Sequence, residues 1–539
     1  MRHTFLSFLL QSLLLVWIAV THVQAIAGDL PEARKDEKAH VAAMTRQVRE
    51  LCERGDYTKA IEAGKAAVST SEKTLGAEDP WTGAAKRALA VAYLEVDDKI
   101  AASPLLRDAI AILERADPPD VTALAYAMGD LAQTVASPKE AESLYRKALA
   151  LAEEAVGPEH SATGHALNNL GWFLYVQDRA QEAEPLMRRA IHVRERTKGL
   201  ADPLTAQSLC SLGAIMGALG DITIAESLIR RSLELRRTML PRSHPDVAES
   251  CSRLAQVLLS QGKERAREAT TLATEAFDVY RRSFGPNASR TLVTMHLKAD
   301  SLALVGRQAE SDRLHQELLA KLESVPASNL ALLADALGDY GDHMLEAGKP
   351  DKAVDLYRRA IALQRKVRGD DDALVIGLRH RLAEALYANV KIDDAVKEGR
   401  EVLAALERTK GEPLSNTGVA LYSLAKYQLA AGEMEEARAL LRRSLAMLEK
   451  TTGRGSRETL QTIHLLTVSY IAMNEREEAE RLIEDAFARF TAQDDVRTGS
   501  ITGDLIGLRA GILRATGRIK EAEEAEAVYK QIEAEERRR

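Results

Sequence analysis

The chain has 539 residues and a formal net charge of −7, from 73 basic and 80 acidic side chains. This near balance excludes a global basic field of the kind that holds nucleic acid. Hydrophobic residues make up 46% of the chain and aromatic residues only 4%, a mixture rich in strong helix formers that predicts an all-α protein.

Residues 1–25 are predicted to be a secretory signal peptide. Residues 5–20 are mostly apolar, and small residues follow that suit cleavage after Ala25 or Ala27. The unbroken apolar run covers only residues 13–20, which is too short to span a bilayer. We therefore expect an exported protein, periplasmic or secreted, without stable membrane insertion after cleavage. An anchor formed by an uncleaved N-terminal segment is the alternative.

After a short lead, residues 26–37, the sequence repeats with a period near 42 over residues 38–539. A small residue, here called the anchor, recurs in a shared context. Successive anchors lie 39 to 44 residues apart, most often 42, at Ala60, Ala102, Ala141, Ala183, Ala225, Ala269, Ser311, Ala353, Ala395, Ala437, Ala479 and Ala522. The period predicts about twelve repeats, the last of them a capping helix pair.

Two further slots keep the same phase and hold turn residues. Five residues before the anchor stand Gly55, Asp97, Asp178, Gly220, Gly306, Gly348, Gly432, Asn474 and Gly517. Sixteen residues after it stand Gly76, Gly157, Gly199, Gly285, Gly369, Gly411 and Gly453, with Pro118 and Pro241 in the same slot. Each unit is therefore predicted to be a helix, a tight turn, a longer helix and a Gly/Pro loop.

The fourth unit carries a family resemblance. It places Leu167, Leu170, Gly171, Leu174, Asp178, Ala183, Met187 and Ala190 where the tetratricopeptide pattern has its large, small and aromatic residues. The longer period and the loop Gly157-Pro158-Glu159-His160 are similar to those of kinesin light chains. HEAT repeats have a similar period but do not explain the paired glycine slots. The resemblance implies a right-handed superhelical α-solenoid of stacked helix-turn-helix repeats that binds peptides.

No phosphate-binding loop, paired Cys-x-x-Cys or zinc-protease motif occurs, so we expect no enzyme, no cofactor and no metal. His296, His380 and His464 share one repeat slot, but residues two repeats apart are too distant to ligate one ion. Solvated or groove-lining histidines are expected instead.

Paired arginines recur with the repeat beside acidic neighbours, so we expect ion pairs on helix surfaces instead of contacts to nucleic acid. They are Arg188-Arg189, Arg230-Arg231, Arg281-Arg282, Arg358-Arg359 and Arg442-Arg443. Cys52, Cys210 and Cys251 are expected to be small buried residues, with a Cys210–Cys251 bridge as the alternative.

The leading hypothesis is an exported protein-interaction scaffold that binds a peptide or a partner protein on the concave face of its first helices. The candidate binding residues stand fifteen or fourteen positions before the anchors. They are Arg87, Tyr126, Asn168, Asn169, Cys210, Ser211, His296, Asp339, His380, Arg381, Tyr422, Ser423 and His464, with the two asparagines as the best single choice. The alternatives are a regulator with a cryptic hydrolase or transferase site and an architectural envelope component that self-associates.

Overall fold

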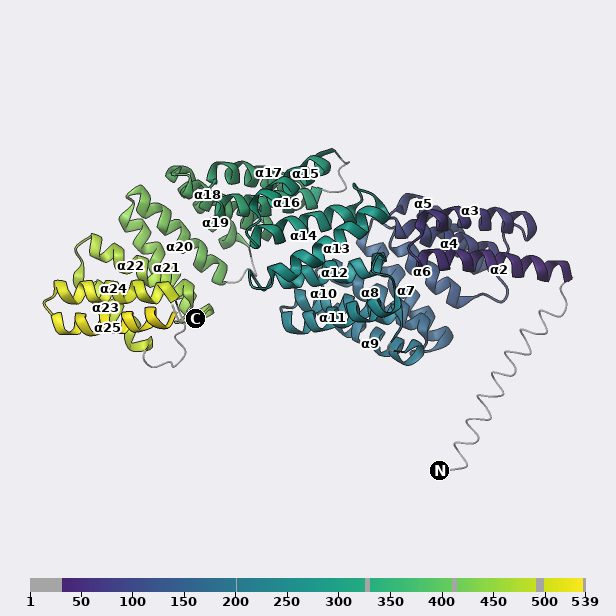
Figure 1. Cartoon of the computed structure of the whole chain (residues 1–539), viewed down its shortest axis with the longest axis horizontal. Helices are drawn as coiled ribbons and strands as arrows, with labels where there is room; N and C mark the ends of the chain where they lie inside the picture. The colour runs from purple at the N-terminus through teal and green to yellow at the C-terminus, as the bar shows by residue number, and fades with distance from the viewer. Residues whose placement is uncertain (1–31, 200, 325–329, 410–413, 491–498, 537–539) are drawn as a thin grey trace, which may run out of the picture. The chain divides into compact units, whose positions relative to one another are not determined.

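The computed structural model describes residues 32–199, 201–324, 330–409, 414–490 and 499–536 (Figure 1). The predicted signal peptide lies outside the described residues. In the described ranges the regular structure consists of 24 helices and includes no strand. None of these helices combines the length and the hydrophobicity that crossing a membrane requires.

The chain divides into two compact units, unit 1 up to Ser311 and unit 2 from Asp312. Unit 1 contains α2 (Glu32–Glu53), α3 (Tyr57–Thr74), α4 (Pro80–Glu95), α5 (Lys99–Arg115), α6 (Val121–Ala132), α7 (Pro138–Val156), α8 (Ser161–Val176), α9 (Ala180–Lys198), α10 (Pro203–Ala218), α11 (Ile222–Met239), α12 (Pro245–Leu259), α13 (Ala266–Phe284) and α14 (Ser289–Leu304). Helix α15 (Gln308–Ser324) begins in unit 1 and continues in unit 2. Unit 2 then contains α16 (Leu330–Glu346), α17 (Pro350–Arg368), α18 (Ala373–Ala388), α19 (Ile392–Arg408), α20 (Leu414–Ala431), α21 (Met434–Thr451), α22 (Arg457–Ala472), α23 (Arg476–Phe490), α24 (Gly499–Ala515) and α25 (Ile519–Glu536).

Helix α2 begins at Glu32, so residues 32–37 are helical although the sequence assigns them to the lead. Their sequence, Glu-Ala-Arg-Lys-Asp-Glu, is rich in helix formers, which explains the earlier start.

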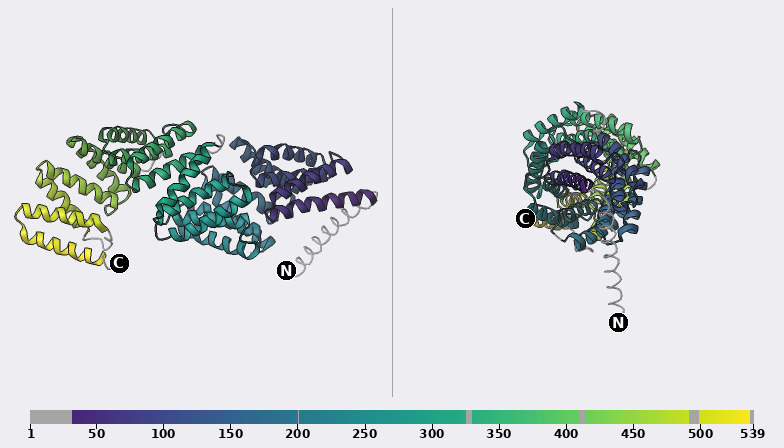
Figure 2. Two further views of the ribbon diagram at one scale, coloured as in Figure 1. Left: turned by 45° about the horizontal axis from the view of Figure 1, so that its top comes forward. Right: turned by 90° about the vertical axis from the view of Figure 1, so that its right-hand side faces the viewer.

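Within each unit the helices pack in consecutive hairpins, each an even-numbered helix with the odd-numbered helix that follows it (Figure 2). Successive even-numbered helices also contact each other, from α2 and α4 to α12 and α14 in unit 1. In unit 2 the same contacts run from α16 and α18 to α22 and α24. Among the described residues, successive odd-numbered helices make no comparable contact. The even-numbered helices therefore lie on the inner side of each stack, here called the inner face, and the predicted α-solenoid is confirmed.

The anchors are the packing positions of the second helices. All twelve are at most 3% exposed, from Ala60 in α3 to Ala522 in α25. A small side chain at this slot lets the neighbouring helix approach closely, because larger side chains would hold the two backbones apart.

The tight turn inside the hairpin holds a residue with left-handed backbone angles. All nine residues that the sequence places five positions before an anchor have φ between +58° and +90°. Glycine, asparagine and aspartate tolerate this region best, so the predicted helix end is confirmed. Val390 fills the same slot in the ninth unit with φ +59°, which the sequence pattern does not reveal.

The loop between hairpins also requires glycine. Gly157, Gly199, Gly285 and Gly369 have φ near +90° and ψ between 168° and 175°. This region is essentially restricted to glycine. Gly411, predicted for the same slot, lies outside the described residues.

A threonine six residues after the loop glycine ties the loop to the next helix. Its hydroxyl donates to the glycine carbonyl oxygen at 2.7–3.1 Å in five repeats. The five threonines, each 0% exposed, are Thr82, Thr163, Thr205, Thr291 and Thr459. This Thr–Gly bond repeats along the chain and is absent from the predicted features.

The paired arginines form ion pairs, as expected, but many of these pairs bridge neighbouring hairpins. Arg188 reaches Glu184 on its own helix at 2.8 Å, while Arg189 reaches Glu153 on the preceding odd-numbered helix at 2.7 Å. The second arginine of a pair meets a glutamate 36 residues earlier in the chain in four repeats. These pairs are Arg189–Glu153, Arg231–Glu195, Arg359–Glu323 and Arg443–Glu407.

The three cysteines are free thiols. Cys210 and Cys251 are buried, as expected, and Cys52 is half-buried.

Candidate functional site

All the candidate binding residues lie on even-numbered helices. Their positions are Arg87 on α4, Tyr126 on α6, Asn168 and Asn169 on α8, Cys210 and Ser211 on α10, His296 on α14, Asp339 on α16, His380 and Arg381 on α18, Tyr422 and Ser423 on α20, and His464 on α22. Asn168, Cys210 and Ser423 are buried, and the remaining residues are at least partly exposed. The slot therefore belongs to the inner side of each stack, while its use in binding stays a prediction.

Asn168 does not present its amide to an open groove. The residue is 4% exposed, and its Oδ1 accepts hydrogen bonds from Ser208 Oγ at 2.8 Å and Arg194 Nη1 at 3.3 Å. Successive residues on a helix point about 100° apart, so Asn168 faces the interface with the neighbouring helices, while Asn169 points away from that interface. The expectation of two accessible asparagines is corrected to one, Asn169.

Arg194 on α9 is a buried cation beneath the inner face of unit 1. It is 1% exposed, and its Nη1 donates to the Leu204 carbonyl at 2.5 Å and to Ser208 Oγ at 2.7 Å. Its Nε and Nη2 are buried without a hydrogen-bond partner. Burial lowers the pKa of Arg194 to about 10, so the guanidinium remains charged at neutral pH.

The equivalent residue one repeat later, Arg236 on α11, is paired instead. Its Nη2 lies 3.0 Å from Glu249 Oε2, and its Nη1 donates to Ser250 Oγ at 2.9 Å. The hydrogen-bond partners of Arg194 are thus neutral oxygen atoms, whereas Arg236 also pairs with a carboxylate.

His165 and Asn169 interact one turn apart on α8. Asn169 Nδ2 lies 3.0 Å from His165 Nε2. Burial, then the charges of Arg194 and Arg87, lower the pKa of His165 to about 3. The imidazole is therefore neutral at physiological pH, so its Nε2 can accept the hydrogen bond that the Asn169 amide donates.

Tyr126 and Arg87 continue this arrangement toward α4. The Tyr126 ring lies 5.0 Å from the His165 ring, and the Arg87 guanidinium lies 4.8 Å above the Tyr126 ring. Arg87 Nε pairs with Asp130 Oδ2 at 2.7 Å. Burial raises the pKa of Asp130 while Arg87 opposes that rise. Asp130, Arg87, Tyr126, His165 and Asn169 thus form one connected set, here called the polar row.

The inner face of unit 1 is strongly curved next to this row. The Arg253 guanidinium on α12 lies 5.1 Å from the Trp172 ring on α8. These helices belong to hairpins separated by the whole α10–α11 hairpin. Side chains two repeats apart can meet only because the even-numbered helices converge on the inner side.

In unit 2 the same slots hold a smaller set of contacts. His380 Nε2 lies 3.0 Å from Ser423 Oγ on the next even-numbered helix, and burial lowers the pKa of His380. Arg381 Nη1 pairs with Asp342 Oδ2 at 2.7 Å and lies 3.9 Å from Asp339 Oδ1.

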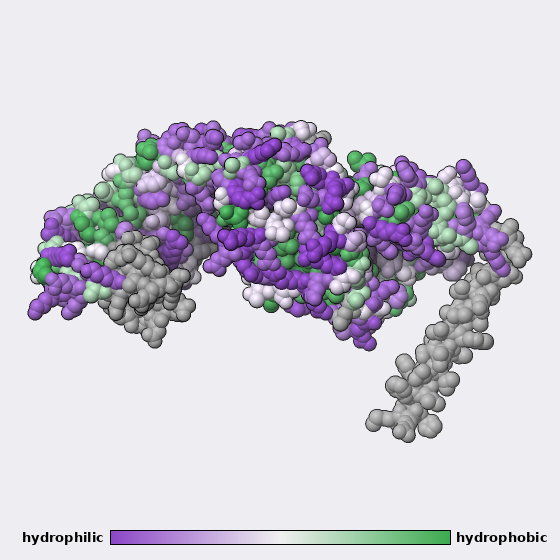
Figure 3. All heavy atoms as spheres, in the orientation of Figure 1, coloured by the Kyte–Doolittle hydropathy of each residue, from purple (hydrophilic) through white to green (hydrophobic). Residues whose placement is uncertain are grey.

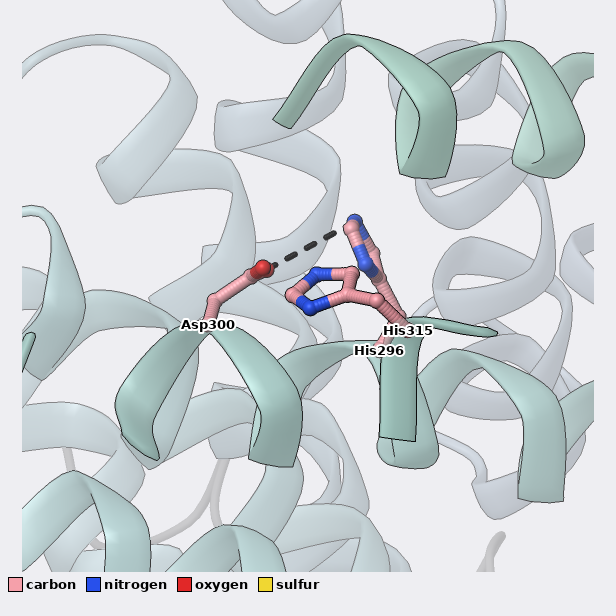
Figure 4. A group of neighbouring side chains, drawn as sticks. All are labelled: His296, Asp300 and His315. Atoms are coloured by element: carbon pink, nitrogen blue, oxygen red, sulfur yellow. Dashed lines mark ion pairs between the residues drawn. The ribbon is translucent and has the colours of Figure 1, made fainter. Parts of the chain in front are cut away.

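His296 is mostly buried, so of the two expectations, solvated or groove-lining, the solvated one is wrong and the groove-lining one stays a prediction. Its side chain is 12% exposed, and its Nε2 lies 3.5 Å from Asp300 Oδ2 one turn along α14 (Figure 4). His315, also drawn in Figure 4, belongs to unit 2, where its ring stacks on Tyr340 with centroids 4.7 Å apart.

The sequence interpretation missed Asp130, His165 and Arg194. One signal could have revealed Arg194, because Arg194 and Arg236 lie 42 residues apart, each eleven positions after its anchor. No periodic signal marks Asp130 or His165, whose roles depend on neighbours from other helices.

The surface drawn in Figure 3 is mostly hydrophilic, with hydrophobic residues in small separate groups. This face is therefore dominated by hydrophilic side chains and shows no single large apolar patch.

Comparisons with known proteins agree with this geometry. The tetratricopeptide repeat family matches residues 50–115, 120–191, 173–238 and 416–492. No curated protein matches the sequence.

Several solved structures are similar. The apo form of the quorum sensor NprR from B. thuringiensis shares 13% identity with a TM-score of 0.51, over 67% of this chain and 95% of that chain. BtubC (BKLC) from P. vanneervenii shares 17% identity with a TM-score of 0.33, over 47% and 94%. Kinesin light chain TPR-like repeats from Podosopora anserina share 19% identity with a TM-score of 0.31, over 37% and 92%.

The family matches fall in both units, on the helical hairpins whose turns and anchors repeat every 42 residues or so. Both units of the chain therefore contain tetratricopeptide repeats, and the solved structures similar to the chain include kinesin light chain-like repeat proteins.

Proposed function

We propose that this protein is an exported scaffold that binds a peptide or a partner protein on the inner face of its even-numbered helices. Tetratricopeptide repeats serve as scaffolds for protein–protein interaction. The polar row in unit 1 is the single observation that carries the proposed location.

The polar row suits a peptide because its groups are partly exposed yet held in place. Arg87 is fixed by the buried Asp130, and the amide of Asn169 is oriented by neutral His165. An extended chain offers both N–H and C=O groups, which amide and guanidinium side chains can satisfy. Side chains ordered before binding lose less entropy when a ligand arrives.

Site-specific photo-crosslinking tests this location. A photoreactive residue at Tyr126 on the inner side should yield a defined covalent adduct in the native compartment. The matched control is Lys147, an exposed residue on the odd-numbered helix α7. Adducts from Lys147 alone would place binding on the outer side and contradict the proposal.

Asn169→Ala should weaken capture of the crosslinked partner by about 1–3 kcal/mol, with the melting curve nearly unchanged. Asn168→Ala is the contrasting variant, because it removes a buried hydrogen-bond acceptor and should lower stability. If Asn169→Ala binds normally, the polar row does not contact the partner.

Export is proposed from residues 1–25. N-terminal sequencing of the native protein should find a chain that begins after Ala25 or Ala27. An intact Met1 on a membrane-bound product would show that the segment is an anchor.

A further inference from the structure

The first hairpin of unit 1 contacts the sixth hairpin, far along the chain. His244 Nε2 lies 2.8 Å from the carbonyl oxygen of Glu53, 191 residues away in sequence. The Tyr57 ring stacks on the Phe284 ring, with centroids 5.4 Å apart and planes 16° apart. Since the intervening hairpins connect these two ends, the contacts close unit 1 into a ring. We call this contact the seam, formed by Glu53, Gly55 and Tyr57 on one side and His244, Pro245 and Phe284 on the other (helices α2, α3, α12 and α13 in Figure 1).

His244 has two tasks that together fix its tautomer. Its Nδ1 accepts from the Asp246 backbone N–H at 3.1 Å and so caps α12. Its Nε2 therefore carries the hydrogen that it donates to the Glu53 carbonyl. His160 caps α8 in the same way, through Ala162 N–H at 3.2 Å, but it is far from the seam.

Gly55 allows the close approach of the two sides. A Cβ atom at Gly55 would lie 2.9 Å from Pro245 Cδ, which is closer than a real Cβ contact. Gly220 occupies the same turn slot with φ +90°, against +76° at Gly55, and a Cβ atom there would meet nothing within 4 Å. The turn alone explains glycine at both positions, whereas the seam adds a second requirement at Gly55 only.

The seam is small. Among the residues that the structure describes, one ring stack, one hydrogen bond and one close approach hold it. Beside the seam, the Glu95 carboxyl lies in the field of the cation Arg290 and of three like charges, Asp246, Glu249 and Asp130. A seam with so few contacts can open without unfolding the hairpins, whose own cores lie elsewhere.

We propose that unit 1 opens and closes at this seam, and that the closed ring admits only an extended chain to its inner face while the open ring admits bulkier partners. The statement about partners rests on the proposed function. The opening itself does not, because it concerns unit 1 alone.

A distance measurement tests the opening in the full chain. Spin labels are placed through Lys59→Cys and Arg282→Cys, two exposed positions on α3 and α13. Burial raises the pKa of Cys210 to about 11 and of Cys52 and Cys251 to about 12, so labelling at pH 7 favours the introduced thiols. We expect one narrow, short distance in the parent protein, and an added longer population in Gly55→Ala.

Gly220→Ala is the matched control. It carries the same left-handed strain, so it should lower the melting temperature comparably while keeping the parent distance. Identical distance distributions in Gly55→Ala and Gly220→Ala, or a broad long distribution in the parent, would overturn the seam. If Gly55→Ala fails to fold, the same comparison can be made between His244→Ala and His160→Ala. Both substitutions remove a helix cap, but only His244→Ala also removes a seam contact.

Chemical access tests the consequence of opening. Ser211→Cys places a thiol on the inner side of α10, and its reaction is followed with N-ethylmaleimide and with a polyethylene-glycol maleimide. The bulky reagent should react severalfold faster in Gly55→Ala than in Gly220→Ala, while the small reagent reacts equally. Equal rates with the bulky reagent would overturn the gating role even if the labelled distance changes. A seam that opens in a chain whose Tyr126 captures no partner would instead refute the proposed function alone.

Discussion

Val390 is the residue with the clearest conflict between side chain and backbone. Its φ of +59° is left-handed, a region that a β-branched side chain adopts at a cost of order 1–3 kcal/mol, and it is 81% exposed. Val390→Gly removes this strain, but glycine also gives the unfolded chain more conformational entropy. The net effect should be to stabilise unit 2 by about 1 kcal/mol.

Urea unfolding measures the effect. Gly348→Ala, in the same slot with φ +68°, is the reverse substitution and should destabilise by a similar amount. A Val390→Gly chain that is less stable than the parent would mean that the valine makes a contact that outweighs the strain.

Glu95 makes the stability of unit 1 depend on pH. Burial and the charges of Asp246, Glu249 and Asp130 raise its pKa from 4.5 to about 7, while Arg290 opposes the rise. The folded state therefore binds a proton more tightly than the unfolded state. Stability is highest below the unfolded pKa and falls as pH rises toward 7, by about 1–3 kcal/mol at most.

Glu95→Gln removes this titration. Its unfolding free energy should change less than that of the parent between pH 5 and pH 8, and it should be the more stable chain at pH 8. Parallel pH profiles for the two chains would show that Glu95 keeps an ordinary pKa.

For single residues, the sequence predicts structure well at positions where the backbone conformation allows only a few residue types. The nine turn residues, Gly55 among them, could be identified because left-handed angles admit few side chains. The burial of Asn168 and of Arg194 could not be predicted, because it depends on partners that lie 10 to 40 residues away, although the 42-residue spacing to Arg236 marks Arg194 as a repeated position.

At the scale of the element, the Thr–Gly bond links each loop to the following helix. Thr205→Val keeps the shape of the side chain but removes the hydroxyl that donates to the Gly199 carbonyl at 3.1 Å. Leaving that carbonyl without its donor should cost about 1 kcal/mol.

Thr197→Val is the matched control, because the Thr197 hydroxyl donates to the Val193 carbonyl of its own helix at 2.8 Å. That carbonyl also takes part in the helix, so the substitution should change the thermal midpoint little. Equal losses in the two variants would show that the loop bond adds nothing specific.

Ion pairs on the helix surfaces could be predicted from the sequence only where both partners lie on the same helix. The Arg188–Glu184 pair follows from i,i+4 spacing, which the sequence displays directly. The Arg189–Glu153 pair requires the register between neighbouring hairpins, which depends on how the anchors pack.

At the scale of the whole molecule, stability should vary along the chain. A large apolar cluster of buried residues runs from Ala132 to Tyr280, whereas the α24–α25 hairpin has a separate small cluster around Leu513. Because repeat arrays open locally, hydrogen exchange should be slowest in α8–α12 and fastest in α24 and α25. Uniform protection in mass-spectrometric exchange would instead indicate a single cooperative unit.

The 42-residue period was enough to predict the fold and the number of repeats, since each repeat contacts mainly its neighbours. The seam was beyond sequence reasoning. It depends on the rotation that accumulates over the four hairpins between those of Tyr57 and Phe284, and small differences in each repeat change where the ends meet.

For a partner bound as proposed, closure of unit 1 would also separate the affinity of binding from the residence time. A chain enclosed by the ring can leave by sliding lengthwise, or sideways only when Tyr57 and Phe284 part. Its lifetime would then follow the opening rate of the ring and the length of the enclosed chain, with contact strength in a lesser role. Weak and adaptable contacts on the inner face could in this way give long residence, and many different sequences could share it.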